Sequence, residues 1–292
     1  MAADLAARFP AARDTLAAID ERLGVPLSRL MAEGPETELQ LTHNAQPAIL
    51  AHSAAVLAVV GSRLDGTACA VGHSLGEYSA YHAAGALDGP TAAALVRRRG
   101  ELMLEAGLTR PGAMAAVIGL ETAAVETACR VASEGGGVVV AANLNTPDQT
   151  VISGDPAAVE RAGTGCKAAG ARKVVSLKVS GAFHSPLMEP AVPGLAEALA
   201  MAGLADPGFP VIANVTAGPV LTAVEAVRLL AAQLTAPVRW VDCIRTAARL
   251  ASSASFIEIG PGSVLTGLLK RILPGAASVT LGTAAEVEAF LS

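Results

Sequence analysis

Apolar residues recur along this chain at two spacings, one typical of helices and one typical of strands. In the first third, helical spacing predicts helices at residues 12–22, 46–64, 78–84 and 90–106. One short apolar run, residues 67–71, predicts a strand that ends directly before a glycine. The N-terminal third is therefore expected to be helical around a single strand.

The pattern changes after Pro111-Gly112. Strands are predicted at 114–120, 138–142, 150–153 and 173–179, with helices at 122–133 and 156–169. This β-α-β-β-α-β order is that of the ferredoxin-like split βαβ unit. We expect residues 112–179 to form a small domain inserted into a larger one made of residues 1–111 and 180–292.

The rest of the chain returns to an alternation of helices and strands. Helices are predicted near 187–202 and at 223–234, 238–251 and 263–271, with strands at 211–215 and 256–259. Such alternation favours a mainly parallel sheet covered by helices. The predicted fold class is α/β, with a large domain of mainly parallel sheet and an inserted ferredoxin-like domain.

Composition narrows the functional classes. Hydrophobic residues make up 52% of the chain but aromatic residues only 3%, so the core must consist of Ala, Val, Leu and Ile. The net charge of −5 and the lack of a basic cluster argue against nucleic acid. We judge the apolar stretches too short for a membrane span of about 18 residues. The N-terminus lacks a signal peptide, which favours the cytoplasm.

The four cysteines lie far apart and form no C-x-x-C motif. This spacing is typical of reduced thiols in a cytoplasmic protein rather than of disulfides or metal ligands. We expect neither a metal nor a cofactor.

The segment Gly72-His73-Ser74-Leu75-Gly76 follows the predicted strand at 67–71 and precedes a predicted helix. A G-x-S-x-G motif in this setting is a nucleophile elbow, which holds a serine oxygen at a helix N-terminus. The first glycine allows the sharp turn and the second allows the helix to pack closely. The N–H of Leu75 would then stabilise negative charge on an oxyanion. The alternative is a polar residue in a glycine-rich turn.

A nucleophilic serine needs a base within hydrogen-bond reach. The chain contains five histidines: His43, His52, His73, His82 and His184. The first four are more typical of structural roles, and residue spacing alone does not decide whether His184 is the base.

Five segments in order resemble one family: GHSLGEYSA, RRRGELM, NLNTPDQTVISG, VSGAFHSPLM and EIGPGSVLTGLLKRI. The chain resembles the malonyl-CoA:acyl carrier protein transacylases of fatty acid synthesis from about Leu5 to Leu281. The resemblance implies an α/β-hydrolase-like large domain and a ferredoxin-like insert. It implies that Ser74 is the nucleophile and His184 the base. It also implies that a main-chain or amide carbonyl, here at Gln233, orients the histidine.

A malonyl group ends in a carboxylate, which is costly to bury unless it is paired. Arginine offers two parallel N–H groups to a carboxylate. Arg97, Arg98 and Arg99 share one predicted helix, and at about 100° per residue they do not all face one pocket. The resemblance assigns the malonyl carboxylate to Arg99 and leaves the other two solvated. An acyl group without a carboxylate would then leave Arg99 buried and unpaired.

The same resemblance places further residues near the acyl group. Phe183 would crowd a 2-methyl branch, and Asn143, Asn145 and Gln149 would lie near the cleft. The alternative for these three polar residues is turn chemistry around Pro147.

The implied reaction has two steps: Ser74 takes the malonyl group from coenzyme A, and the phosphopantetheine thiol of acyl carrier protein then takes it from Ser74. Carrier proteins of this kind are acidic, so we expect a basic rim. The candidates are Lys167, Arg172, Lys173, Lys178, Lys270 and Arg271. We expect the enzyme to act as a monomer.

Three other readings stay open. The transacylase subunit of malonate decarboxylase, or a stand-alone polyketide acyltransferase, would use the same chemistry with a different carrier. A serine esterase would need an acid before its histidine and an H-G-G-G-type segment, which the sequence lacks. An inactive remnant that binds carrier protein would have no reason to keep Ser74, His184 and Arg99 together.

The sequence departs from the family pattern at its start. The family opens with an apolar strand and a P-G-Q-G-S-Q loop, which do not precede Met1 here. That loop supplies the family's second oxyanion donor. We expect the chain as written to be less stable or less active than one with this segment.

Overall fold

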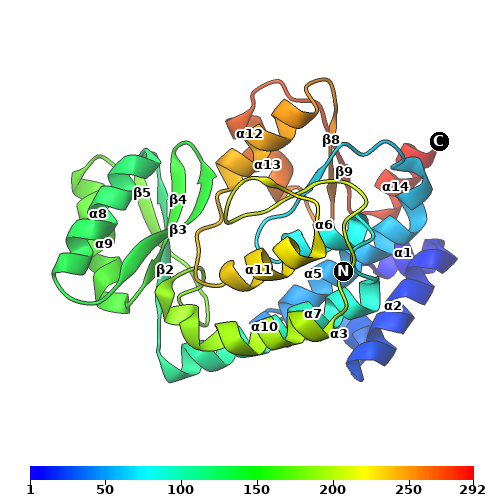
Figure 1. The fold of residues 1–292 in the computed structure, drawn as a ribbon, viewed down its shortest axis with the longest axis horizontal. Coiled ribbons are helices and arrows are strands. Elements are labelled where there is room, and N and C mark those ends of the chain that lie inside the picture. The colour runs from blue at the N-terminus through cyan, green and yellow to red at the C-terminus, as the bar shows by residue number, and fades with distance from the viewer.

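The computed structural model describes all 292 residues, and Figure 1 shows two lobes side by side. A smaller lobe at the left contains β2 to β5 with α8 and α9. A larger body holds both termini and all other elements. The chain leaves the larger body once and returns to it once. The fold is α/β, as predicted.

The N-terminal part of the larger body is helical. Its helices are α1 (Ala3–Arg8), α2 (Pro10–Leu23), α3 (Leu27–Glu33), α4 (Glu36–Leu39), α5 (Thr42–Val60), α6 (Gly76–Ala83) and α7 (Gly89–Thr109). Local chemistry sets some of these bounds: Asp88 accepts a hydrogen bond from the N–H of Thr91, and Pro90 occupies the first turn of α7. Helices α1, α3 and α4 were not predicted.

Helix α5 corrects one prediction from composition. Residues 42–63 are long and apolar enough by length and composition to span a membrane. The judgement that every apolar stretch is too short was therefore wrong. Of its most apolar 18-residue window, however, 61% is buried inside the protein. Because α5 packs against α2 and α7, its apolar surface serves as core.

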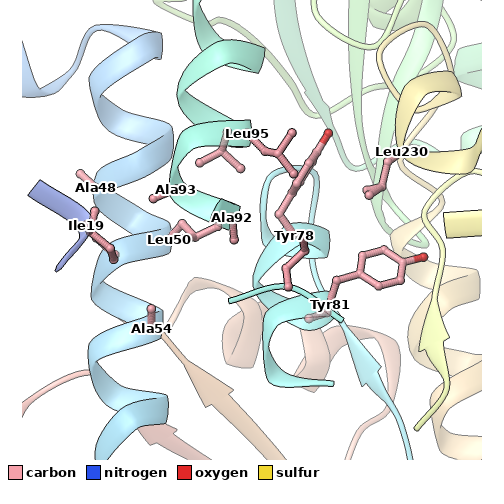
Figure 2. Close-up of a cluster of buried hydrophobic side chains, with 14 of the residues drawn as sticks. Ile19, Ala48, Leu50, Ala54, Tyr78, Tyr81, Ala92, Ala93, Leu95 and Leu230 are labelled. Atoms are coloured by element: carbon pink, nitrogen blue, oxygen red, sulfur yellow. The ribbon is translucent and has the colours of Figure 1, made fainter. Parts of the chain in front are cut away.

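The main core lies where α5, α6 and α7 meet. Small side chains dominate α5 and α7, and both tyrosines of the chain, Tyr78 and Tyr81, are fully buried on α6. In Figure 2 the two rings leave α6 in different directions, with Tyr81 extending toward Leu230. The expectation of a core built from small aliphatic residues holds for the helix contacts, while the tyrosines fill the larger spaces around α6.

The smaller lobe has the predicted β-α-β-β-α-β order. It consists of β2 (Ala113–Ile118), α8 (Thr122–Glu134), β3 (Val139–Thr146), β4 (Gln149–Gly154), α9 (Pro156–Ala168) and β5 (Lys173–Ser176). The strands pair antiparallel in the order β3-β4-β2-β5. Helices α8 and α9 bury their apolar residues against this sheet in a separate cluster. The domain limits at 112 and 179 stay a prediction.

The sheet of the larger body is in two pieces. Strand β1 (Ala70–Val71) pairs parallel with β6 (Val211–Ile212), which pairs antiparallel with β7 (Pro219–Val220). Strand β8 (Phe256–Ile259) pairs parallel with β9 (Ser278–Leu281). The strands predicted at 67–71 and 211–215 are thus shorter than expected. An apolar groove separates the pieces, lined by Val71, Phe256, Ile257, Trp240, Ile244, Leu265 and Leu269.

The remaining helices are η2 (Pro186–Ala191), α10 (Val192–Met201), α11 (Ala223–Ala232), α12 (Trp240–Leu250), α13 (Val264–Ile272) and α14 (Ala284–Leu291). Of these, α12, α13 and α14 pack against this divided sheet, whereas η2 and α10 pack against α7, and α11 packs against α10. The two ends of the chain meet, because Asp4 accepts a hydrogen bond from the N–H of Ala284. Neither β9 nor α14 was predicted.

Candidate active site

Ser74 lies in the sharp turn between β1 and α6 and has a left-handed backbone conformation, with φ of 53°. A β-carbon on Gly72 would lie 1.9 Å from the carbonyl oxygen of Gly76, so only glycine fits there. A β-carbon on Gly76 would meet nothing within 4 Å. The close approach therefore occurs at the first glycine, and the packing role predicted for the second was wrong.

Asn214, the second residue after β6, binds both sides of this turn. Its side-chain oxygen accepts a hydrogen bond from the N–H of Ser74 at 2.7 Å, and its Nδ2 donates to the carbonyl oxygen of Gly72 at 2.7 Å. Asn214 is fully buried. The pairing of β6 with β1 thus delivers an amide that stabilises the strained turn.

His184 lies in the segment that returns from β5 to η2 and is 4% exposed. Its Nε2 is 2.8 Å from the Oγ of Ser74, and its Nδ1 is 2.9 Å from the main-chain oxygen of Gln233. A carbonyl oxygen only accepts, so Nδ1 carries the proton. Nε2 is then free to accept the proton of Ser74. Burial, reinforced by the charge of Arg99, lowers the pKa of His184 to about 3, which keeps the ring neutral.

Arg99 is 1% exposed and approaches Ser74 from α7. Its Nη2 donates to the Oγ of Ser74 at 3.0 Å and to the Oε1 of Gln233 at 2.9 Å. Its Nη1 donates to the Oε1 of Gln46 at 2.6 Å, whereas its Nε has no partner. A buried guanidinium thus lies beside the serine oxygen, and one of its three nitrogens, Nε, has no partner.

Gln233, at the end of α11, connects the two sides of the site through different atoms. Its main-chain oxygen accepts from His184 and its side-chain oxygen accepts from Arg99. Its Nε2 donates to the Oε2 of Glu77 at 2.7 Å. The sequence left open whether the main-chain or the side-chain carbonyl of Gln233 orients the histidine. In the structure the main-chain carbonyl is the one that contacts His184.

Leu75 follows Ser74 as the first residue before α6. Its main-chain N–H donates to no acceptor within the protein. The N–H groups of Gly76, Glu77 and Tyr78, by contrast, each find a carbonyl oxygen in the same turn. A free N–H at a helix N-terminus next to the serine is the arrangement expected of an oxyanion donor.

The other predicted binding residues lie on the small lobe or on the loop that returns from it. Asn145 accepts a hydrogen bond on its Oδ1 from the Nε2 of His73, beside Ser74. Asn143 is buried and its backbone bridges to Val238. Gln149 lies against Arg271 and makes no hydrogen bond to the three central side chains. Phe183, next to His184, packs into the apolar clusters of both lobes.

Two of the remaining histidines make contacts with main-chain oxygens, whereas the Nδ1 of His43 is buried without a partner. His52 lies 2.8 Å from the carbonyl oxygen of Gly282, and His82 lies 2.8 Å from that of Leu87. Arg98 is exposed, as expected. Arg97 differs from the expectation of a solvated side chain, because it is partly buried and donates to both Glu101 and Asn44.

Sequence reasoning missed two contributors. Asn214 and Gln46 each bind a central group of the site, yet neither belongs to a motif with chemistry of its own. Glu77 appeared only as part of the family motif, and its position in the first turn of a helix gave no sign that it would be buried.

The family model of the acyl transferase domain matches residues 1–285. The chain belongs to the acyl transferase family. The malonyl CoA-acyl carrier protein transacylase of Bacillus subtilis (strain 168) is 44% identical over 277 residues, which are 93% of this chain and 86% of the relative.

Solved structures agree with this assignment. An acyl carrier protein S-malonyltransferase from Vibrio cholerae is 42% identical with a TM-score of 0.93, covering 99% of this chain and 94% of that one. A malonyl-transacylase in complex with a type II polyketide synthase acyl carrier protein is 40% identical with a TM-score of 0.94, covering 100% and 94%. This acyltransferase therefore shares its whole fold with enzymes that bear malonyl-transfer names.

Proposed function

We propose that this acyltransferase moves a malonyl group from malonyl-CoA to the phosphopantetheine thiol of acyl carrier protein through an ester on Ser74. The contact between Arg99 and the Oγ of Ser74, at 3.0 Å, carries this proposal. A buried guanidinium at the nucleophile suits an acyl group that ends in a carboxylate. The relatives named as malonyl-transfer enzymes support the same substrate.

In the first step the hydroxyl of Ser74 gives its proton to the Nε2 of His184 while Oγ bonds to the thioester carbon. The N–H of Leu75 stabilises the oxyanion, and the carbon–sulfur bond then breaks. Coenzyme A leaves as the thiol with the proton from His184. The malonyl carboxylate accepts from the guanidinium of Arg99, whose Nη2 donates to the Oγ of Ser74 in the free enzyme.

In the second step the carrier thiol gives its proton to His184 as its sulfur bonds to the ester carbon. The carbon–oxygen bond to Ser74 breaks, and His184 returns the proton to Oγ. The carbonyl of Gln233 stabilises the transient imidazolium without adding a buried charge. We propose acyl carrier protein of fatty acid synthesis as the acceptor, and a cytoplasmic monomer as the working form.

Intact mass after mixing with malonyl-CoA tests the first step. We expect the mass to rise by one malonyl group in the wild type and to stay unchanged in Ser74→Ala. Loss of the added mass on incubation with holo acyl carrier protein, with the malonyl group recovered on the carrier, tests the second step. A wild type that gains no mass would contradict the proposal.

The choice of carrier is tested by competition. A type II polyketide synthase carrier is the specific alternative, because one similar structure is a complex with such a carrier. Equimolar carriers of fatty acid and polyketide synthesis should be malonylated at different rates, the former faster. The reverse order would assign the enzyme to polyketide synthesis.

A further inference from the structure

The mechanism above leaves one buried ionisable group unused. Glu77 lies in the first turn of α6 and its side chain is fully buried. Its Oε2 accepts hydrogen bonds from the main-chain N–H of Asn214 at 3.0 Å and from the Nε2 of Gln233 at 2.7 Å. Its Oε1 has no partner. A carboxylate held by two neutral amides, without a cation in contact, is costly and calls for a reason.

The side-chain amide of Gln233 connects the carboxylate of Glu77 to Arg99 through two hydrogen bonds. Nη2 of Arg99 donates to Oε1 of Gln233, and Nε2 of the same amide donates to Oε2 of Glu77. An amide has one oxygen and one NH₂ group, so pairing with Glu77 turns its oxygen toward Arg99. The main-chain oxygen of Gln233 also accepts a hydrogen bond from the Nδ1 of His184. Glu77 therefore helps to position both Arg99 and His184 through its hydrogen bond with Gln233.

We propose that Glu77 is a positioning residue and the resident counter-charge of Arg99, and that its carboxylate takes up a proton from solvent when a malonyl carboxylate binds Arg99. In the free site the positive charge of Arg99 is balanced by the negative charge of ionised Glu77. With malonyl bound, two ionised carboxylates would share that guanidinium in a buried cluster, and protonation of Glu77 restores neutrality. The inference rests on the proposed function, because it requires an acyl group with a carboxylate.

The local electrostatics agree with this coupling. Burial raises the pKa of Glu77 to about 7, against the opposing effects of Asn214, Gln233 and Arg99. A second carboxylate on Arg99 would weaken its effect on Glu77 and raise the pKa further. Burial raises the pKa values of Tyr78, Tyr81 and Cys243 and lowers those of Arg99, His73 and His184. The pKa of Glu77 is therefore close to neutrality in the free site.

Kinetics across pH 5.5 to 8.5 test the proposal, with the malonyl thioester of N-acetylcysteamine as the substrate because it has no titrating phosphate. In the wild type we expect KM to rise with pH above neutrality, by up to about tenfold per unit for one coupled proton. In Glu77→Gln, which keeps an oxygen for both donors, KM should stay flat over this range. A merely structural role would change KM or kcat by a constant factor without changing the slope.

Glu258→Gln is the matched control. Like Glu77, Glu258 accepts two hydrogen bonds, in its case both from main-chain N–H groups, of Leu265 and Thr266. It makes no hydrogen bond to the catalytic side chains. It should keep the wild-type slope. The same slope in Glu77→Gln as in the wild type would overturn the inference while leaving the malonyl adduct on Ser74 intact. Absence of that adduct from the wild type would instead overturn the proposed function.

A second measurement avoids the variant at Glu77, in case it does not fold. Calorimetry of malonyl-CoA binding to Ser74→Ala at pH 7.5, in two buffers that differ in ionisation enthalpy, counts the protons taken up. With coenzyme A alone as the baseline, we expect a net uptake of up to about three quarters of a proton per malonyl group, because Glu77 is already partly protonated at this pH. Equal uptake for malonyl-CoA and coenzyme A would overturn the proposal.

Discussion

Ser74 and Arg99 lie 25 residues apart in the chain, yet the guanidinium donates a hydrogen bond to the serine oxygen in the free enzyme. Their elements, α6 and α7, pack together beside the central helix α5. Under the proposed function, the charge that would select the acyl group therefore lies within one hydrogen bond of the atom that would attack it. If Ser74 is the nucleophile and Arg99 the specificity group, a change at Arg99 should alter selectivity before it alters the fold.

Replacing Arg99 by Ala should reduce the preference for malonyl-CoA over acetyl-CoA. The variant loses a charged hydrogen-bonding partner for the carboxylate, which contributes about 2–3 kcal/mol, so the ratio of kcat/KM values should fall by about 30- to 150-fold. Arg98→Ala, one residue away and exposed, is the control and should leave the ratio unchanged. An unchanged ratio in Arg99→Ala would remove the basis for malonyl selectivity.

The lowered pKa of His184 should make the stability of the protein depend on pH. Its pKa is about 3 in the folded protein and about 6.5 when unfolded, so the unfolded chain binds more protons in this window. Stability is fully present above pH 6.5 and is lost as pH falls toward 3. Relative to His184→Gln, the wild type should lose about 1.6 kcal/mol of unfolding free energy between pH 6.5 and 5. Urea titrations at both pH values measure this difference, and parallel losses would contradict it.

The two glycines of the elbow should respond differently to alanine. Gly72→Ala places a methyl group against the backbone of Gly76, which should cost about 3 kcal/mol or more and distort Ser74. Gly76→Ala finds open space and should change stability by less than about 1 kcal/mol. Thermal unfolding and acylation rates of the pair make a direct comparison. Equal effects would show that the turn does not depend on the close approach at Gly72.

Asn214→Ala should destabilise the elbow, although Asn214 is far from it in the sequence. It leaves the N–H of Ser74 and the carbonyl of Gly72 without partners in a buried place, at a cost of about 2–4 kcal/mol. The acylation rate should fall as Ser74 loses its fixed position. Thr216→Ala, in the exposed turn that follows, is the control. A variant with wild-type stability and rate would show that the two hydrogen bonds are dispensable.

Local patterns predicted the parts of the fold that depend on local interactions. The helix at 122–133 and the strand at 256–259 are within a residue of the observed α8 and β8. The strand at 67–71 shrinks to two residues in β1, because pairing with β6 rather than apolar character determines its length. The missed helix α14 did carry a local signal, the capping box of Thr283 and Glu286.

The residues of the site likewise divide into those with a local sequence signal and those whose role depends on tertiary contacts. Ser74 stood out because the elbow is a local turn with a local sequence signature. The elbow-holding Asn214 lies 140 residues away and gains its role only when β6 pairs with β1. Gln46 binds Arg99 only because α5 and α7 pack together. Roles created by tertiary contact leave no periodicity in the sequence.

The groove between β1 and β8 affects the tendency of the protein to self-associate at high concentration. Each of these strands pairs on one side only, so its outer edge presents N–H and C=O groups without a strand partner. Val71, Phe256 and Ile257 add apolar surface along the same groove. Open edges of this kind accept an extended segment from another chain, by the route that leads to domain exchange and to ordered aggregates. Self-association of this acyltransferase should therefore begin at the break in its own sheet.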